Sequence, residues 1–313
     1  MLLRRLTDFI LASRLRAMAV AFATSFIPVP GGSVGVLVAS LVTLRKGAFE
    51  GSLVFCAALA ASLASYVFYR NSANAWMLWQ VTWIGCALGL LTWLLVLILR
   101  RTSSWAIVTE LSGLCGILVI LGLHLAFPGI QGWWVEQLTA WFHKSTSMIG
   151  HFLPDMGSAA MQPEAVSAAW IASFSRYATG FLVTSFLVNL LLQVMIARAW
   201  EAAVFTRGLL RQELHAFRAD RVAGLLFIIV LVAALMGSML ALDMLPVLLM
   251  VFCLAGFCLV HALFALLRRG WVALLFFYAG VVVFFPFSLA IVAIAGLFDV
   301  WLDFRGKRIL KKR

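Results

Sequence analysis

The side chains of this sequence that could do chemistry are a few charged residues inside or beside long apolar stretches. Asp299 and Asp303 stand four positions apart, with Trp301 between them and Arg305 just beyond. On a helix, two carboxylates at this spacing share one face. They could act as general acid and base, or they could form a structural cluster with neighbouring arginines. The nearby basic residues favour the structural interpretation.

Glu110 and Arg176 lie within apolar runs. A charged group is costly in lipid and usually faces a cavity or an opposite charge. At 1.5 Å per residue, counted from the ends of their runs, the two depths differ by only about 5 Å. Three interpretations remain open. Glu110 and Arg176 form an intramembrane ion pair, Arg176 and Tyr177 face a ligand in an outward cavity, or the arginine reaches back to the membrane surface.

The remaining polar residues in apolar runs are expected to join helices. Asn189 and Gln193 stand one turn apart and should bond neighbouring helices, as should the isolated His124 and His261. The sequence contains no GxxxxGK[ST] and no HExxH motif, and no acidic or histidine cluster has metal-ligand spacing. We therefore expect a protein that is not an enzyme and that holds no metal or cofactor.

Composition determines the broad class. Of the 313 residues, 64% are hydrophobic and 12% charged, and the mean hydropathy is +1.06. So little polar surface cannot cover a water-soluble domain, so the lipid bilayer is the expected surroundings. The net charge of +12 comes from basic residues at the ends of apolar runs. This placement indicates membrane orientation and anionic lipid headgroups rather than nucleic acid.

The apolar runs predict one all-α membrane domain over residues 1–313, a bundle of about eight to ten membrane helices. Helices are expected because lipid cannot satisfy backbone amides. The runs are Ala17–Leu44, Ala48–Tyr69, Met77–Leu99, Ser104–Phe127, Val166–Ala197, Val222–Leu242, Val247–Leu267 and Trp271–Phe298.

Two of these runs are broken, the first at 28–32 and the last at Pro286. If the first run turns back at its break, nearly all basic groups fall on the side of the N-terminus, as the positive-inside rule requires. By the same rule, the last run should turn back at Pro286 and leave the basic tail, 305–313, on that side. A single kinked span with the tail outside is the alternative. We expect a bacterial inner-membrane protein with both termini in the cytoplasm.

Two segments are amphipathic rather than spanning. Residues 131–153 carry several tryptophans and are expected to form an interfacial helix on the outer side. Residues 198–221 interleave aromatic residues with Arg211, Glu213 and Arg218. This cytoplasmic segment is expected either to lie on the anionic inner leaflet or to dock a protein partner.

The segment 198–218 resembles the cytoplasmic segment of the YybS-like bacterial membrane proteins, a family of unknown function. The stretch Gly296-Leu-Phe-Asp-Val-Trp-Leu-Asp-Phe-Arg305 is similar to the Gly-Leu-x-Asp-x-Trp-x-Asp-x-Arg ending of that family. Together with the order of the apolar runs, this resemblance covers almost the whole chain.

The first third of the chain resembles, more distantly, the substrate-binding S-components of energy-coupling-factor transporters. The matching features are Ala19 and Ala23, the loop Pro28–Ser33, and Leu44-Arg45-Lys46-Gly47. The resemblance implies that Pro28, Pro30, Gly31, Gly32 and Ser33 gate an outward cavity. It also implies that the alanine face packs on a transmembrane coupling subunit, which works with ATPases.

Two functions follow from these features. The first is a transporter-like subunit that binds a small solute, of unknown identity, without catalysing a reaction. The alternative is a structural or regulatory membrane protein that meets its partner through 198–221 and the C-terminal residues. On that view the partner-facing side chains include Asp299, Trp301, Asp303 and Arg305.

Overall fold

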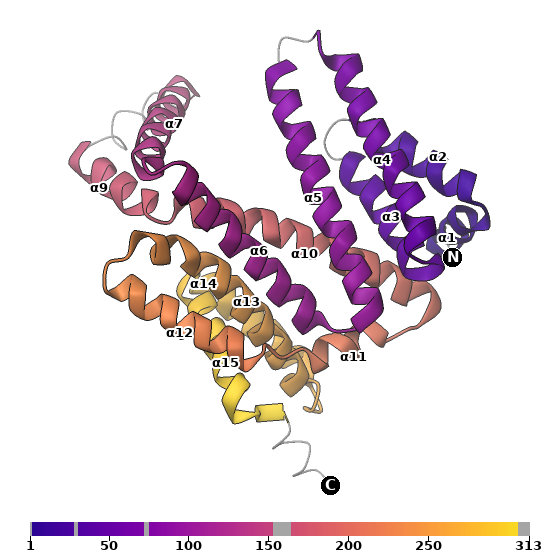
Figure 1. The fold of residues 1–313 in the computed structure, drawn as a ribbon. Helices are drawn as coiled ribbons and strands as arrows, with labels where there is room; N and C mark the ends of the chain where they lie inside the picture. Colours follow the sequence, from indigo (N-terminus) through magenta and orange to yellow (C-terminus); the bar gives the residue numbers. More distant parts are fainter. Residues whose placement is uncertain (1, 28–30, 72–74, 153–163, 306–313) are drawn as a thin grey trace.

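The computed structural model describes residues 2–27, 31–71, 75–152 and 164–305, which form 14 helices and no strand (Figure 1). The expected all-α bundle is thus confirmed. The first half of the chain forms α1 (Leu2–Ala12), α2 (Arg14–Ser25), α3 (Gly31–Lys46), α4 (Ala48–Tyr69), α5 (Ala75–Thr102), α6 (Trp105–Ala126) and α7 (Ile130–Phe152). The second half forms α9 (Glu164–Ser175), α10 (Ala178–Phe205), α11 (Leu209–Ala216), α12 (Arg221–Leu235), α13 (Met239–Phe264), α14 (Gly270–Val283) and α15 (Phe287–Leu302).

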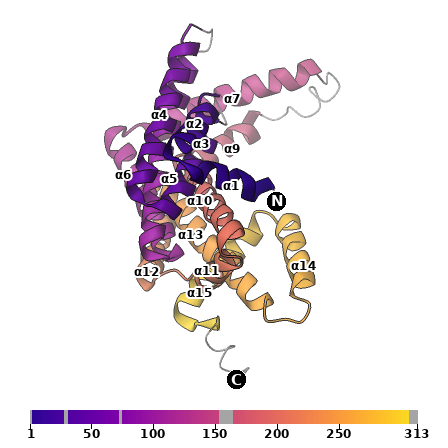
Figure 2. The same ribbon diagram turned by 90° about the vertical axis from the view of Figure 1, so that its right-hand side faces the viewer.

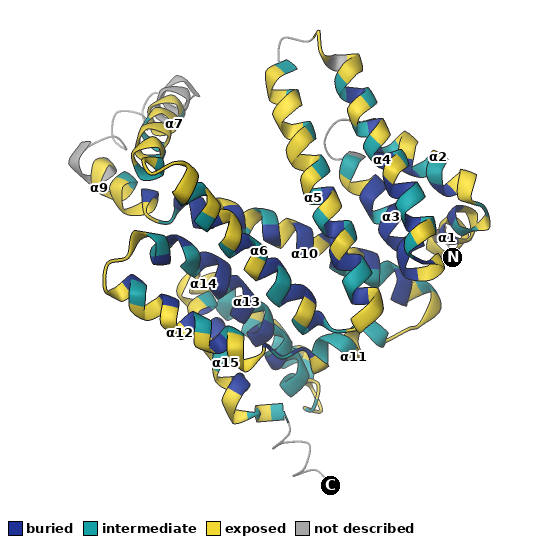
Figure 3. Cartoon of the chain, in the orientation of Figure 1, coloured by how far each residue is buried: buried dark blue, intermediate teal, exposed yellow. Residues whose placement is uncertain are grey.

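Five of the described helices, α4, α5, α6, α10 and α13, are long and apolar enough to cross a bilayer, and α12, α14 and α15 are shorter apolar helices. Large apolar side chains such as Phe68, Trp76 and Phe276 remain exposed around them. Exposed residues cover the outside of the bundle along most helices (Figure 3). Soluble proteins rarely show apolar surface on this scale. The chain is a multi-pass integral membrane protein.

Helices α10 and α13 form the centre of the main core, where Leu190 and Val194 meet a buried cluster that includes Val247 and Phe252. Helices α13 and α15 also approach each other closely. A Cβ atom on Gly256 would lie 2.0 Å from the carbonyl oxygen of Val292. Glycine is therefore required there, as at other close crossings of membrane helices.

The break predicted at 28–32 is confirmed, because α2 ends at Ser25 and α3 begins at Gly31. The two helices pack tightly, since a Cβ atom on Gly35 would lie 1.8 Å from Ser25 Oγ. A second hydrophobic core lies between α1, α2, α3 and α4, and Ala17 and Ala21 of α2 are buried in it. A plain change of direction between two short helices thus builds the N-terminal part of the bundle.

Basic side chains gather at one end of the bundle, called the basic end below. There Arg45 Nη1 lies 3.3 Å from Glu201 Oε1, and Arg305 Nη1 donates to the carbonyl oxygen of His215 at 2.5 Å. Trp200 Nε1 donates to Thr7 Oγ1 at 2.8 Å, which places α1 at the same end. The N-terminal helix and residues 303–305, directly after α15, therefore share one end, as the charge pattern predicts. Residues 306–313 of the basic tail lie outside the described part of the chain.

The last apolar run consists of two helices, since α14 ends at Val283 and α15 begins at Phe287. Because α15 ends beside α11 at the basic end, the prediction that the chain turns back at Pro286 is confirmed. The alternative, a kinked single span that carries the tail to the opposite end, is wrong.

The two amphipathic segments have different outcomes. Helix α7 projects from the bundle away from the basic end, with Trp133 and Trp141 exposed (Figures 1 and 2). A helix over 131–152 is confirmed, and residue 153 lies outside the described part of the chain. The position of this helix at the membrane surface stays a prediction.

The second amphipathic segment, 198–221, is not one separate surface element. Helix α10 continues to Phe205, Gly208 turns the chain with φ 89°, and α11 packs on the core through Leu210 and Leu214.

Candidate functional site

A cavity of about 150 Å³ lies next to the connection between α2 and α3. Its walls come from α2, α3, α4, α5 and α10. The polar part of the lining consists of hydroxyl and carboxamide side chains: Ser25, Ser33, Ser62, Ser65, Thr82, Asn189 and Gln193.

Small residues set the shape of this cavity. Where helices touch, glycine permits close packing, as at Gly89, whose Cβ would lie 3.0 Å from Val36 Cγ2. Gly85 differs, because a Cβ atom there would meet nothing within 4 Å. Gly85 lines the cavity and is exposed. A larger side chain at Gly85 would therefore occupy the cavity rather than disturb the helix packing.

Two buried polar atoms beside the cavity lack a hydrogen-bond partner among the described residues, Ser25 Oγ and Gln193 Oε1. The amide nitrogen of Gln193 donates to Asn189 Oδ1 at 2.7 Å, which leaves its oxygen free to accept. Leaving such a group unsatisfied costs about 1–3 kcal/mol. A polar molecule in the cavity would remove that cost. Asn189 and Gln193 were expected to bond neighbouring helices, but they bond each other on α10.

The described lining contains no Lys, Arg, His, Asp or Glu. A charged solute would lose its hydration without gaining an opposite charge, which is strongly unfavourable in an apolar environment. The cavity is therefore suited to an uncharged molecule with hydrogen-bonding groups.

The expected gate residues are partly at this cavity. Gly32 and Ser33 line it, and Gly31 begins α3. Pro28 and Pro30 lie outside the described residues.

Arg176 and Tyr177 do not line this cavity, so the expected role of Arg176 in binding an anionic ligand there is wrong. The long run 166–197 is not one helix. Arg176 lies in the connection between α9 and α10, at the end opposite the basic end.

The expected pairing of Glu110 with Arg176 is also wrong. Glu110 lies near the start of α6 at the basic end, where its Oε1 accepts from the backbone nitrogen of Asp220 at 2.5 Å. The break at Arg176 separates the two charges along the bundle axis. The estimate of equal depth failed because it counted Arg176 as ten residues inside a continuous helix.

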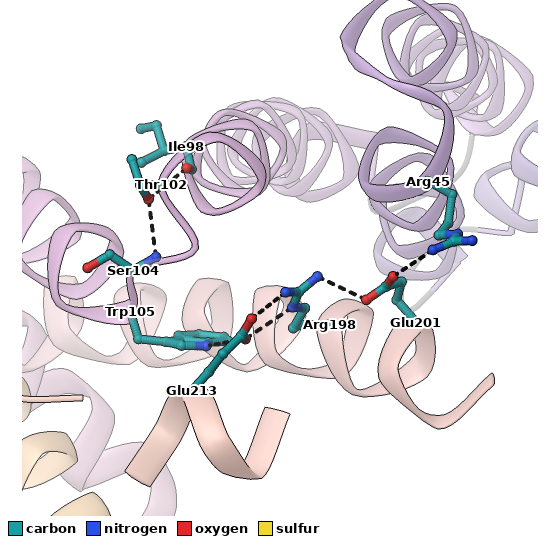
Figure 4. A network of polar contacts seen from close by, with 8 residues as sticks. All are labelled: Arg45, Ile98, Thr102, Ser104, Trp105, Arg198, Glu201 and Glu213. Atoms are coloured by element: carbon teal, nitrogen blue, oxygen red, sulfur yellow. Dashed lines mark hydrogen bonds and ion pairs between the residues drawn. The ribbon is translucent and has the colours of Figure 1, made fainter. Parts of the chain in front are cut away.

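The main network of ion pairs at the basic end is centred on Arg198 and does not include Glu110 (Figure 4). Arg198 Nη1 donates to Glu201 Oε2 at 2.9 Å, and its Nε donates to Glu213 Oε2 at 3.1 Å. Trp105 Nε1 donates to the same Glu213 oxygen at 3.1 Å. With Arg45 on the far side of Glu201, this network joins α3, α6, α10 and α11. Glu213 therefore faces the interior of its own chain and not a partner.

The cluster at the end of α15 supports the structural interpretation of the paired aspartates. The helix ends at Leu302, and Asp303 takes a left-handed conformation with φ 46°. The two carboxylates consequently meet different arginines and do not share one helix face. Asp299 Oδ2 lies 3.1 Å from Arg305 Nε, and Asp303 Oδ1 lies 3.2 Å from Arg218 Nη1.

Of the residues expected to face a partner, four remain on the surface. Ala19, Ala23, Arg211 and Trp301 are exposed. Arg218 and Arg305 are half-buried in contacts within the chain, and Asp299 is buried. The C-terminal cluster is thus mainly an internal contact.

One buried ionisable pair was not anticipated from the sequence. His124 Nε2 lies 2.8 Å from Asp243 Oδ2, and the backbone nitrogen of Gly180 donates to Asp243 Oδ1 at 3.0 Å. Asp243 is fully buried. Both histidines do join helices as expected, since His261 Nε2 lies 2.7 Å from the hydroxyl of Tyr278. The sequence places Asp243 between two apolar runs, a position that suggests a loop. In the structure Asp243 lies one turn inside α13.

The chain contains one sequence pattern that is typical of hydrolases. Gly31-Gly32-Ser33-Val34-Gly35 matches Gly-x-Ser-x-Gly. In hydrolases this motif forms a sharp turn between a strand and a helix. Among the described residues there is no strand, and Ser33 stands in the first turn of α3. Gly35 is explained by its contact with Ser25, so the match does not indicate a nucleophile.

Comparison with known proteins finds no matching family model, no matching curated protein and no matching solved structure. The class of this protein, a multi-pass helical membrane protein with a polar cavity between its helices, therefore rests on its own fold and chemistry.

Proposed function

We propose that the protein is the solute-binding subunit of a bacterial inner-membrane transport system, and that it takes a small uncharged polar solute into the cavity beside the α2–α3 connection. The observation that carries the proposal is the pair of unpartnered buried atoms, Ser25 Oγ and Gln193 Oε1, which belong to two residues that line a cavity of about 150 Å³. The resemblance to S-components supports it, because in those proteins the corresponding loop gates the solute site.

The size and chemistry of the cavity support a compact, uncharged solute. Its volume of about 150 Å³ corresponds to roughly five water molecules at ~30 Å³ each. Gln193 Oε1 requires a hydrogen-bond donor, whereas the serine hydroxyls accept or donate. A compact amide, polyol or nucleobase fits this description better than any ion.

The position of the cavity supports uptake from outside. If the basic end faces the cytoplasm, as the positive-inside rule requires, then the lining residues of α2, α3 and α4 come from the outer halves of their helices. On this orientation the solute enters from the outside, next to the α2–α3 connection.

Coupling to a partner is proposed through α2. Ala17 and Ala21 are used in the chain's own core, whereas Ala19 and Ala23 are exposed on the other face. Small residues let membrane helices approach closely. Ala19→Leu with Ala23→Leu should therefore abolish solute uptake in cells and leave binding by the purified protein unchanged.

A thermal-shift screen of the detergent-purified protein tests the proposal. The probes are glycerol, uracil and nicotinamide, each compared with a charged counterpart, namely glycerol phosphate, orotate and nicotinate. We expect stabilisation by an uncharged probe and not by its charged counterpart. Gln193→Leu should weaken binding by roughly 5- to 150-fold, the equivalent of ~1–3 kcal/mol for a lost buried hydrogen bond.

A matched pair of glycine variants separates cavity filling from damage to the fold. Gly85→Leu should abolish the response, because its side chain fills the cavity. Gly122 on α6 also has open space around its Cβ position and does not line the cavity, so Gly122→Leu should respond like the unmodified protein. If no probe stabilises the protein, or if both variants respond equally, the solute-binding function is wrong and the scaffold alternative takes its place.

A further inference from the structure

A second and larger cavity, of about 490 Å³, lies between α6, α10, α11, α13 and α14. This volume is within the range of ~300–1,000 Å³ typical of ligand sites. The two cavities use different faces of α10. Asn189 and Gln193 line the first, and Val188, Leu192 and Met195 line the second. The second cavity is therefore a separate site, and its argument does not depend on the proposed solute.

Most of the wall of this second cavity is hydrocarbon. Helix α10 contributes Val188, Leu192 and Met195, and α13 contributes Leu254 and Phe257. Val188 and Leu192 are also exposed on the lipid-facing surface. The cavity consequently has an apolar side opening through which a hydrocarbon chain could enter from the bilayer.

Helix α14 forms the loosely attached wall of the cavity. None of its described residues is buried, and it stands apart from the other helices in Figure 2. Its contribution to the lining is Tyr278, whose hydroxyl meets His261 Nε2 at 2.7 Å. An elongated ligand can therefore lie between α14 and α10 without disturbing the buried core.

The end of the cavity nearest α11 is polar. It is formed by Arg211, which carries the positive charge, together with His215 and His261. Glu213, the carboxylate of the same helix, is held by Arg198 and Trp105. Among the described residues no carboxylate pairs with Arg211, so its guanidinium is available to an anion.

We propose that this cavity binds one acyl chain of an anionic phospholipid, with the lipid phosphate beside Arg211 and His215. The hydrocarbon wall accounts for the chain, and the unpaired guanidinium accounts for the phosphate, which arginine binds with two parallel hydrogen bonds. The charged end of the cavity lies at the basic end of the bundle, near Arg305. That is the level of the headgroups of the inner leaflet, where anionic lipids are attracted by basic residues.

Native mass spectrometry of the full chain in detergent tests this site. Phosphatidylglycerol and phosphatidylcholine with identical acyl chains are titrated, together with glycerol phosphate and diacylglycerol. Both lipids carry a phosphate, but in phosphatidylcholine the choline cation offsets its charge. We therefore expect phosphatidylglycerol to bind at least about tenfold more tightly than phosphatidylcholine. Glycerol phosphate and diacylglycerol should both bind weakly, because each lacks one half of the recognised molecule.

Two matched pairs of variants assign the parts of the lipid. Arg211→Gln should remove most of the preference for phosphatidylglycerol, whereas Arg207→Gln, at an exposed position outside the cavity, should keep it. Leu192→Trp should reduce binding of both lipids by filling the apolar wall. Ile196→Trp, one turn along α10 and not in the lining, should not.

Three results would overturn the proposal. The first is equal binding of the two phospholipids by the unmodified protein. The second is an equal loss of preference in Arg211→Gln and Arg207→Gln, which would indicate a general effect of net charge. The third is tight binding of glycerol phosphate alone, which would indicate a site for free phosphate compounds rather than for lipid.

Discussion

Replacing His124 by leucine should leave the carboxylate of Asp243 without its strongest partner inside the bundle. The imidazole Nε2 lies 2.8 Å from Asp243 Oδ2, and the other carboxylate oxygen accepts from the backbone nitrogen of Gly180 at 3.0 Å. Asp243 has no exposed surface. After the replacement, one carboxylate oxygen would remain buried next to hydrocarbon, and neither water nor another described side chain could take its place without a rearrangement.

Two magnitudes bracket the expected loss. A hydrogen bond between membrane helices contributes about 0.6–1.7 kcal/mol, whereas removing one partner from a buried ion pair costs about 3–5 kcal/mol. Because Asp243 is fully buried, we expect His124→Leu to lower the free energy of unfolding by about 3 kcal/mol. Asp243→Asn should cost only about 1 kcal/mol, because asparagine still accepts from Gly180 and can still bond the imidazole.

The double variant, His124→Leu with Asp243→Asn, completes the test. With no carboxylate left to strand, it should be more stable than His124→Leu alone, and the coupling between the two sites should be about 2 kcal/mol. The assay is reversible unfolding of the purified protein in mixed micelles with increasing denaturing detergent. His261→Leu serves as the control, because its bond to Tyr278 is exposed and should contribute less than about 1 kcal/mol. If the effects of the two substitutions add within about 0.5 kcal/mol, the pair does not stabilise the bundle and this reasoning is refuted.

Three further predictions follow from other contacts. Gly180→Ala should prevent assembly of the native bundle, because its Cβ would lie 1.9 Å from the carbonyl oxygen of Asp243, and the loss of folded protein can be followed by size-exclusion chromatography. Arg198→Met should destabilise the protein by about 3 kcal/mol in the same unfolding assay, because it leaves the buried carboxylate of Glu213 with only Trp105 and that of Glu201 with only Arg45. Arg198→Lys should recover only part of this loss. Burial, followed by nearby positive charge, lowers the pKa of His215 below its usual value near 6.5. As the pH falls, the imidazole of His215 therefore binds a proton more readily in the unfolded state than in the folded state. Its contribution to the free energy of unfolding should be constant above pH 6.5 and should decrease as the pH is lowered through and below 6.5. His215→Gln should reduce this dependence in melting curves between pH 8 and 5, and an unchanged dependence would contradict the assignment.

The elements of the fold could be predicted from local patterns, because bilayer thickness and the charge of the connections constrain them strongly. The runs of apolar residues indicated the long helices. The grouping of basic residues indicated that the chain turns back at 28–32 and at Pro286, and both turns are present. The break at Arg176 was missed because the adjacent sequence, Ser175 to Ala178, contains neither proline nor glycine.

The sites could be predicted much less well, because each combines side chains from helices far apart in the sequence. Asp243 and His124 are 119 positions apart, and no local pattern links them. The polar cavity combines Ser25 with Gln193, although the resemblance to S-components did imply that Gly32 and Ser33 would border a cavity. Glu213 appeared to be a surface residue because its helix is amphipathic, and only the position of Arg198 shows that it faces inward.

The central position of α10 has a consequence for how the chain assembles during synthesis. Thr7 meets Trp200 across 193 positions, and Arg45 meets Glu201 across 156. Helices α1 to α5 must therefore enter the membrane before Thr7 and Arg45 can meet their partners on α10. Contacts of such long sequence separation slow folding and leave intermediates exposed. The early helices can remain stable in lipid meanwhile, because Arg45 lies near the end of α3 and Thr7 lies on α1 at the basic end. At that level the membrane surface can hydrate both side chains until Trp200 and Glu201 have been translated.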